Sequence, residues 1–133
     1  DMLLIARIES FNLDKPLEDA LERAFAYTKA GADGIMIHSR RKSPDEVFSF
    51  CEAFRAVDKT SPLVVVPTTF NEITEEEFER RGVNIVIYAN PLTRSAFPAM
   101  KKTAETIVTH HRAAEADALC MPIKEILTLI PEV

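Results

Sequence analysis

Polar and ionisable side chains follow four short apolar runs of this sequence, at the point where each run ends. Arg7 and Glu9 close the first run, and His38 closes the second. Thr68 and Asn90 hold the equivalent positions after the third and fourth runs. Arginine presents a planar fork of N–H donors that suits carboxylate or phosphate, and histidine exchanges a proton near neutral pH. The predicted chemistry is therefore the binding of a small anion at these ends.

Each of these residues also has a purely structural interpretation. Arg7 and Glu9 alternate to the same face of a strand, so they form either a structural ion pair inside a barrel or an anion-binding pair in which Glu9 orients the substrate. Arg7 lies in an otherwise apolar strand, where a buried arginine is costly without a neutralising anion. His38, followed by Ser39, is either a structural histidine or part of the site. Thr68 and Asn90, after the third and fourth strands, either contact ligand or cap loops.

The elements that position these side chains alternate between β and α patterns. Strands are expected near residues 3–9, 34–38, 63–68 and 84–90, and helices near 14–29, 44–56, 74–81, 93–111 and 122–129. The third strand is apolar on both faces, which is typical of a parallel strand covered by helices. This alternation predicts an α/β fold with a parallel sheet and right-handed crossovers.

The length of the chain indicates what kind of parallel sheet this is. Eight βα units close a (β/α)₈ barrel, whose active site lies at the carboxyl ends of the strands and whose length is typically about 250 residues. This chain has 133 residues and four such units. We therefore predict a partial (β/α)₈ (TIM) barrel plus C-terminal helices, with residues 1–133 forming half of a barrel. The sequence also opens directly in a strand, which suggests a piece of a longer protein.

Local signals support several of the expected element ends. Pro16 suits a first helical turn, and Ser43 is expected as an N-cap with Pro44 at the first helical position. Thr74 begins a capping box whose partner is Glu77. Pro98 fits the fourth helix only if it lies near the first turn.

Composition excludes several classes of function. The formal charge of −5 argues against a nucleic-acid surface, and the one basic cluster, residues 40–42, is predicted to be a solvated loop. No apolar stretch is long enough for a membrane span. Cys51 and Cys120 are widely spaced and predicted to be buried thiols, which suggests a reduced, cytoplasmic protein. No GxGxxG or GxxxxGK loop is present.

Four motifs in order resemble the C-terminal half of phosphoenolpyruvate mutase and of the related phosphonopyruvate hydrolase, both in the isocitrate lyase superfamily. They are ARIE at residues 6–9, AGADGIMIHS at 30–39, VVPT at 65–68 and VIYAN at 86–90. PIKEIL at residues 122–127 is similar to a late segment of those enzymes. One stretch departs from the family pattern: residues 10–15 replace an apolar, glycine-containing segment, which leaves the subfamily open.

The resemblance implies a site for an α-keto acid that bears a phosphoryl or phosphonyl group. Arg7 and His38 match the family residues beside that group and are the expected catalytic residues. Glu9, Ser39, Thr68 and Asn90 are expected to contact substrate with them. The resemblance also implies a Mg²⁺ ion in the full-length parent, with its ligands outside this chain, so no metal ligand is assigned here. The fragment by itself is expected to be inactive.

Three functions stay open at this stage. The leading hypothesis is a fragment of an isomerase that interconverts phosphoenolpyruvate and phosphonopyruvate. A phosphonopyruvate hydrolase or a carbon–carbon lyase of the same superfamily is the second, and a non-catalytic flavodoxin-like binding module is the third. Half a barrel would also expose two strand edges, so we expect either self-association or coverage of the edges by the terminal helices.

Overall fold

The computed structural model describes residues 2–129, and the chain divides into two compact units, Asp1–Ala89 and Asn90–Val133. The first unit contains a four-stranded parallel sheet in the order β1-β2-β3-β4, so neighbours in sequence are neighbours in the sheet. Its strands are β1 (Ile5–Ile8), β2 (Gly34–Ile37), β3 (Leu63–Val65) and β4 (Ile85–Val86). Its helices are the 3₁₀ helix η1 (Phe11–Leu13), α1 (Leu17–Lys29), α2 (Asp45–Val57) and α3 (Glu75–Arg80). With α4 (Pro91–His110), which follows β4 in the sequence, these elements make up the four predicted βα units.

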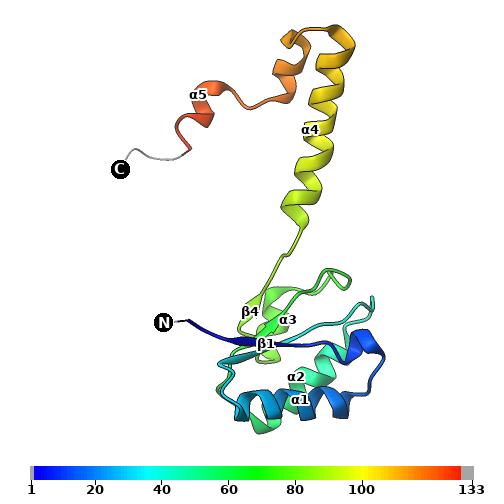
Figure 1. Cartoon of the computed structure of the whole chain (residues 1–133), viewed down its shortest axis with the longest axis vertical. Helices are drawn as coiled ribbons and strands as arrows, with labels where there is room; N and C mark the ends of the chain where they lie inside the picture. The colour runs from blue at the N-terminus through cyan, green and yellow to red at the C-terminus, as the bar shows by residue number, and fades with distance from the viewer. Residues whose placement is uncertain (1, 130–133) are drawn as a thin grey trace. The chain divides into compact units, whose positions relative to one another are not determined.

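The hydrophobic core lies between the sheet and its helices, and Figure 1 shows α1 and α2 together on one side of the strands. Alternate strand residues point into this core, as the pleat requires. The aromatic rings of Phe25, Phe54 and Phe50 stack in series inside it, with centroid separations of 5.5 and 5.6 Å. The strand residues that contribute to it are Ile8, Ile35, Ile37, Leu63 and Val65.

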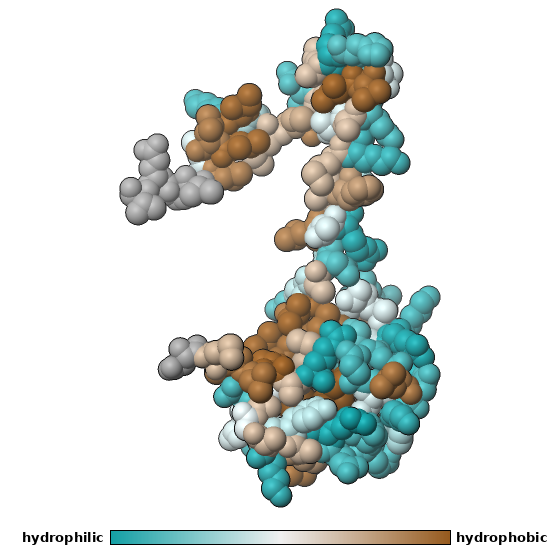
Figure 2. Space-filling model, in the orientation of Figure 1, coloured by the Kyte–Doolittle hydropathy of each residue, from teal (hydrophilic) through white to brown (hydrophobic). Residues whose placement is uncertain are grey.

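The opposite face of the sheet is only partly covered by the residues of the first unit. Along β1, Ile8 is buried whereas Arg7 is exposed. Exposed apolar side chains accompany the two edge strands, and Figure 2 shows hydrophobic surface on the first unit. β3, in the middle of the sheet, is buried at all three positions, as predicted from its apolar run. The exposed apolar residues before β1 and around β4 are Leu3, Leu4, Ile85, Ile87 and Tyr88.

The first two helices begin later than the sequence pattern predicts. The first begins at Leu17 rather than at residue 14, because η1 precedes it and Asp14 adopts a left-handed conformation with φ of 53°. The second begins at Asp45 with Pro44 as its N-cap, so the predicted N-cap, Ser43, lies one residue too early; its hydroxyl accepts a hydrogen bond from the Asp45 N–H at 3.3 Å. The predicted cap of α3 is confirmed, since Thr74 Oγ1 accepts from the Glu77 N–H.

Glycine permits one close contact in the sheet. A Cβ atom on Gly34 would lie 2.7 Å from the backbone oxygen of Pro62, which is too close for any side chain. Gly31 and Gly82 instead have positive φ angles of 104° and 77°, in the turns that precede β2 and β4. Both turns use a backbone conformation that is cheap only for glycine.

The second unit contains α4 (Pro91–His110), the 3₁₀ helix η2 (Ala114–Leu119) and α5 (Ile123–Ile126). α4 starts two residues earlier than predicted, so Pro98 lies inside the helix rather than in its first turn. Because proline has no N–H, the Arg94 carbonyl loses its helical partner there. Among residues 2–129, no helix combines the length and the apolar character that crossing a membrane requires.

The two cysteines differ in environment. Cys51 is buried, as predicted, and burial raises the pKa of its thiol to about 12. The prediction for Cys120 is wrong, since this thiol is exposed. Cys120 follows the end of η2 in extended backbone, so it does not lie on the buried face of a helix.

Candidate functional site

The register of the sheet places three of the predicted site residues on one face. Arg7 pairs with Met36 in the parallel ladder between β1 and β2. Alternation along each strand therefore directs Arg7, Glu9 and His38 to the face opposite the helices. All three lie at or just beyond the carboxyl ends of neighbouring strands, as predicted.

The side chains of these residues make direct contact. The Arg7 guanidinium forms an ion pair with the Glu9 carboxylate through its Nε, and its Nη2 lies 3.2 Å from His38 Nδ1. Asn12 Nδ2 lies 2.7 Å from the same His38 nitrogen and also donates to Glu9 Oε2. We call Arg7, Glu9, Asn12 and His38 the strand-end cluster. It combines one cation, one carboxylate, an amide and an imidazole.

Asn12 was not predicted as a site residue. It lies in η1, in the stretch that departs from the family pattern, and the turn of η1 brings it back towards Glu9. The difference from the family pattern at residues 10–15 could have indicated Asn12, because it places polar residues soon after the end of a strand. Neither helix nor strand periodicity indicates such a turn.

Arg7 is not buried in this chain, contrary to what its apolar strand suggested. Its side chain is 48% exposed and that of Glu9 is 42% exposed. An apolar strand sequence does not tell which face of the sheet is covered, and within the first unit α1 and α2 cover the other face. An ion pair this exposed contributes about 0–1 kcal/mol to stability, so the fold does not depend on it.

The cluster shifts the protonation of its members. Partial burial favours a protonated Glu9, but hydrogen bonds from Asn12 and Arg7 and the charge of Arg7 outweigh it and lower the pKa of this carboxyl. Burial and the nearby Arg7 charge lower the pKa of His38, against a smaller opposing effect of Glu9. The cluster therefore holds an ionised Glu9 beside a His38 that favours the neutral form.

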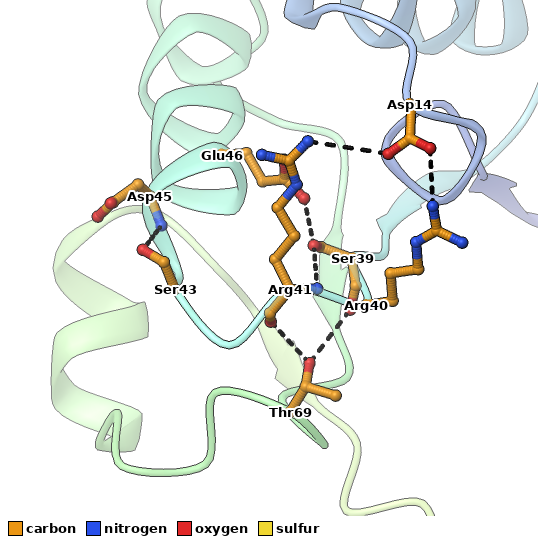
Figure 3. Close-up of polar contacts among 8 residues, drawn as sticks. All are labelled: Asp14, Ser39, Arg40, Arg41, Ser43, Asp45, Glu46 and Thr69. Atoms are coloured by element: carbon orange, nitrogen blue, oxygen red, sulfur yellow. Dashed lines mark hydrogen bonds and ion pairs between the residues drawn. The ribbon is translucent and has the colours of Figure 1, made fainter.

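Ser39 takes part in a second polar network, which Figure 3 shows. Its hydroxyl is buried, donates to the Glu46 carboxylate at the start of α2 and accepts from the Arg41 N–H at 3.0 Å. The Arg41 guanidinium also pairs with Glu46, at 3.1 Å. These contacts fix the loop that begins directly after His38.

The same network links three loops at the carboxyl ends of the strands (Figure 3). Asp14, after β1, pairs with Arg40 at 2.7 Å and with Arg41 at 3.8 Å, both after β2. Thr69, after β3, donates to the Arg41 carbonyl at 2.9 Å. Residues 40–42 are thus a loop after a strand, as predicted, and two of their charges are paired with acids.

The remaining two candidates, Thr68 and Asn90, lie in different units of the chain. Thr68 is exposed, and its backbone N–H bonds the Val66 carbonyl at 2.9 Å. Its neighbour Thr69, rather than Thr68, contacts the loop after β2. Asn90 belongs to the second unit, where it precedes α4 and accepts the Arg94 N–H at its backbone carbonyl.

Comparison with known proteins decides the family. The family model for phosphoenolpyruvate phosphomutase matches residues 1–108, which is most of the chain. The chain belongs to this family. Its phosphomutase relatives include those of Tetrahymena pyriformis and Streptomyces hygroscopicus, which are 35% and 34% identical to it over 97% of its length. Phosphonopyruvate hydrolase from Variovorax is 37% identical, also over 97%.

The phosphomutase family places the chain in the isocitrate lyase superfamily, as the motifs implied. 2-Methylisocitrate lyase from Aeropyrum pernix is a more distant relative, with 33% identity over 81% of this chain. The chain spans less than half of its phosphomutase and hydrolase relatives. It covers 42% of the Tetrahymena protein, 40% of the Streptomyces hygroscopicus protein and 44% of the Variovorax protein.

Solved structures of the family confirm the fold class. The phosphoenolpyruvate phosphomutase of Streptomyces platensis superposes with a TM-score of 0.85 at 34% identity, over 94% of this chain and 42% of that one. Phosphonopyruvate hydrolase in complex with oxalate and Mg²⁺ gives 0.84 at 37% identity, over 94% and 44%. The four-stranded sheet is accordingly a partial (β/α)₈ barrel.

The Mg²⁺ ion of the phosphonopyruvate hydrolase structure raises the question of a metal site, which the strand-end cluster does not fit. Glu9 is its one carboxylate, and both Glu9 oxygens already accept hydrogen bonds from Arg7 and Asn12. Magnesium prefers several oxygen ligands, whereas this cluster mainly presents nitrogen donors. No group of three or more potential ligands occurs anywhere in residues 2–129.

Proposed function

We propose that residues 1–133 are the C-terminal half of an enzyme that interconverts phosphoenolpyruvate and phosphonopyruvate, and that this half binds the phosphoryl group. The observation that carries the proposal is the contact between Arg7 and His38 at the carboxyl ends of adjacent strands. Active sites of (β/α)₈ barrels lie at this end of the sheet. The strand-end cluster faces away from the helices, as an interior site of a complete barrel would.

Arg7 keeps donors free for an anion. Its Nε is engaged with Glu9, and its Nη2 faces His38. A guanidinium has five N–H groups, and Nη1 bonds no residue within the described range 2–129. These free donors suit the oxygens of a phosphoryl or phosphonyl group, for which arginine offers paired hydrogen bonds.

The reaction would use this fixed charge at its transition state. A phosphoryl group in transfer passes through a loose, metaphosphate-like state whose charge spreads over its oxygens. Donors that are already oriented stabilise such a state without reorganising. Glu9 and Asn12 hold Arg7 and His38 in place, so they orient the two catalytic residues. Ser39 acts through the loop after β2, and substrate contacts of Thr68 and Asn90 stay predictions from the sequence.

A Mg²⁺ ion belongs to the proposal for the full-length parent only. The phosphonopyruvate hydrolase structure contains Mg²⁺ with oxalate. We place its ligands outside this chain, since the described residues do not form such a site. The isolated chain is then expected to be catalytically inactive. Its expected location is the cytoplasm.

Phosphonopyruvate hydrolysis is the second candidate, favoured by the 37% identity to the Variovorax enzyme. Both reactions need the same phosphonyl contacts, so the strand-end cluster does not separate them. A superfamily carbon–carbon lyase would not need a phosphonyl site. The flavodoxin-like alternative fits poorly, because that fold has strand order 2-1-3-4-5 whereas this sheet runs β1-β2-β3-β4.

Calorimetric titration of the chain with phosphonopyruvate tests the proposal. We expect weak but saturable binding, because the anion contacts are present while the rest of the site is not. Pyruvate is the matched control ligand, since it keeps the keto acid and lacks the phosphonyl group. Equal binding of both ligands, or no binding of phosphonopyruvate, would contradict the proposed role.

We also propose that the chain self-associates, with two copies covering the uncovered face and edges of the sheet. β1 and β4 are edge strands, and apolar side chains beside them are exposed, among them Leu3 and Ile87. Unpaired strand edges favour pairing with another chain. Sedimentation velocity should show a concentration-dependent dimer or larger species. A monodisperse monomer whose edge-strand amides exchange freely would refute this expectation.

A further inference from the structure

We propose that Asn12 is a positioning residue that fixes the proton of the neutral His38 ring on Nε2. Asn12 lies in η1, three residues beyond Glu9, and its side-chain amide spans the gap between Glu9 and His38. The position of the proton matters because His38 Nε2 donates a hydrogen bond when it carries the proton and accepts one when it does not.

The orientation of the Asn12 amide follows from Glu9. The same amide atom hydrogen-bonds Glu9 Oε2 and lies 2.7 Å from His38 Nδ1. An ionised carboxylate only accepts hydrogen bonds, so this atom must be the NH₂ nitrogen. The reversed amide would set its carbonyl oxygen against the carboxylate. It would also place the NH₂ group at the buried position that Oδ1 now occupies. That position offers no hydrogen-bond partner among residues 2–129.

His38 Nδ1 therefore faces donors only. Asn12 Nδ2 approaches it at 2.7 Å and Arg7 Nη2 at 3.2 Å. A guanidinium has no acceptor, and the Asn12 NH₂ group has none either. A proton on Nδ1 would point at these N–H groups, so Nδ1 must be the unprotonated nitrogen and Nε2 must carry the hydrogen.

The charges around the ring agree with this assignment. Arg7 and Glu9 are the charged groups that act on His38, and Arg7 opposes a second proton on the ring. Burial of the ring acts in the same direction and is the larger of the two effects on the His38 pKa. The neutral Nε2–H form is thus the resting state near neutral pH.

The consequence for binding rests on the proposed function, but the proton assignment does not. No residue within 2–129 hydrogen-bonds His38 Nε2, so its N–H is available to an oxygen of a phosphonyl group. With the proton on Nδ1, the lone pair of Nε2 would instead face that oxygen and repel it. By keeping the proton on Nε2, Asn12 would give His38 a hydrogen-bond donor for an anion.

Nitrogen-15 NMR of the chain, without any ligand, tests the assignment. At a pH above the His38 pKa, we expect a pyrrole-type chemical shift for Nε2 and a pyridine-type chemical shift for Nδ1. The Asn12→Asp variant replaces the donor by an acceptor, so we expect the proton to move to Nδ1 and the ring to titrate at higher pH. Asn71→Asp adds the same charge at an exposed residue and should leave the tautomer unchanged.

Two results would overturn the inference. A pyrrole-type Nδ1 in the unmodified chain contradicts the assignment, and an unchanged tautomer in Asn12→Asp contradicts the role of Asn12. If Asn12→Asp does not fold, Asn12→Ala takes its place, with a larger fraction of Nδ1–H as the expected result and an unchanged ratio as the contrary one. Loss of phosphonopyruvate binding alone, with the tautomer as expected, would count against the proposed function instead.

Discussion

Replacing Arg7 by alanine is expected to weaken phosphonopyruvate binding by roughly 10- to 100-fold. Hydrogen bonds to charged groups are worth about 1.5–3 kcal/mol, and about 1.4 kcal/mol corresponds to a factor of ten in affinity. Arg7 is the one cation in the strand-end cluster, and its Nη1 donors are available to the ligand. Titration calorimetry of both chains under the same salt conditions measures the difference.

Two further variants separate the geometry of Arg7 from its charge. Arg7→Lys keeps the charge but loses the planar fork, so its affinity should lie between those of the unmodified chain and Arg7→Ala. Arg40→Ala removes an exposed arginine that is paired with Asp14, outside the cluster, and should bind almost normally. Equal losses of phosphonopyruvate affinity in Arg7→Ala and Arg40→Ala would mean that only the total positive charge at the carboxyl ends of the strands matters.

Phe50→Ala is expected to destabilise the first unit by about 3–5 kcal/mol, as is usual for a buried aromatic residue. The Phe50 side chain is fully buried, stacks on Phe54 at 5.6 Å and meets the edge of Phe11 at 6.5 Å. Its removal leaves a cavity between α2 and the sheet. Since small domains are stable by only about 5–15 kcal/mol, the midpoint of urea unfolding should fall strongly.

The matched control for this prediction is Phe97→Ala. Phe97 lies in α4 and is 66% exposed, so the same truncation removes little buried surface there. We expect a change within about 0.5 kcal/mol, the usual range for surface substitutions. Similar unfolding midpoints for Phe50→Ala and the unmodified chain would show that the core is not where the structure places it.

The βα units could be predicted because their signals are local. The apolar run of β3 and the Thr74 cap each depend on a few adjacent residues, and the structure retains both. The errors arose where the answer depends on distant parts of the chain. Exposure of Arg7 depends on which face the helices cover, and exposure of Cys120 depends on where η2 ends.

The candidate site was predictable to a similar extent. Strand register brings Arg7 and His38 together, and the sequence indicates that register because each strand ends in a polar residue. Asn12 was missed because a 3₁₀ turn has no apolar period of its own. Thr69 makes the loop contact although Thr68 was selected, since a one-residue difference reverses the direction of a side chain.

A crystal structure of the chain with phosphonopyruvate is the most direct test of the central claim, that the strand-end cluster binds the phosphonyl group. We predict phosphonyl oxygens within hydrogen-bond distance of the Arg7 guanidinium and of His38 Nε2, with Asn12 still against Nδ1. A phosphonyl group bound elsewhere, for example at residues 40–42, while the strand-end cluster stays free of ligand at saturating concentration, would contradict the claim.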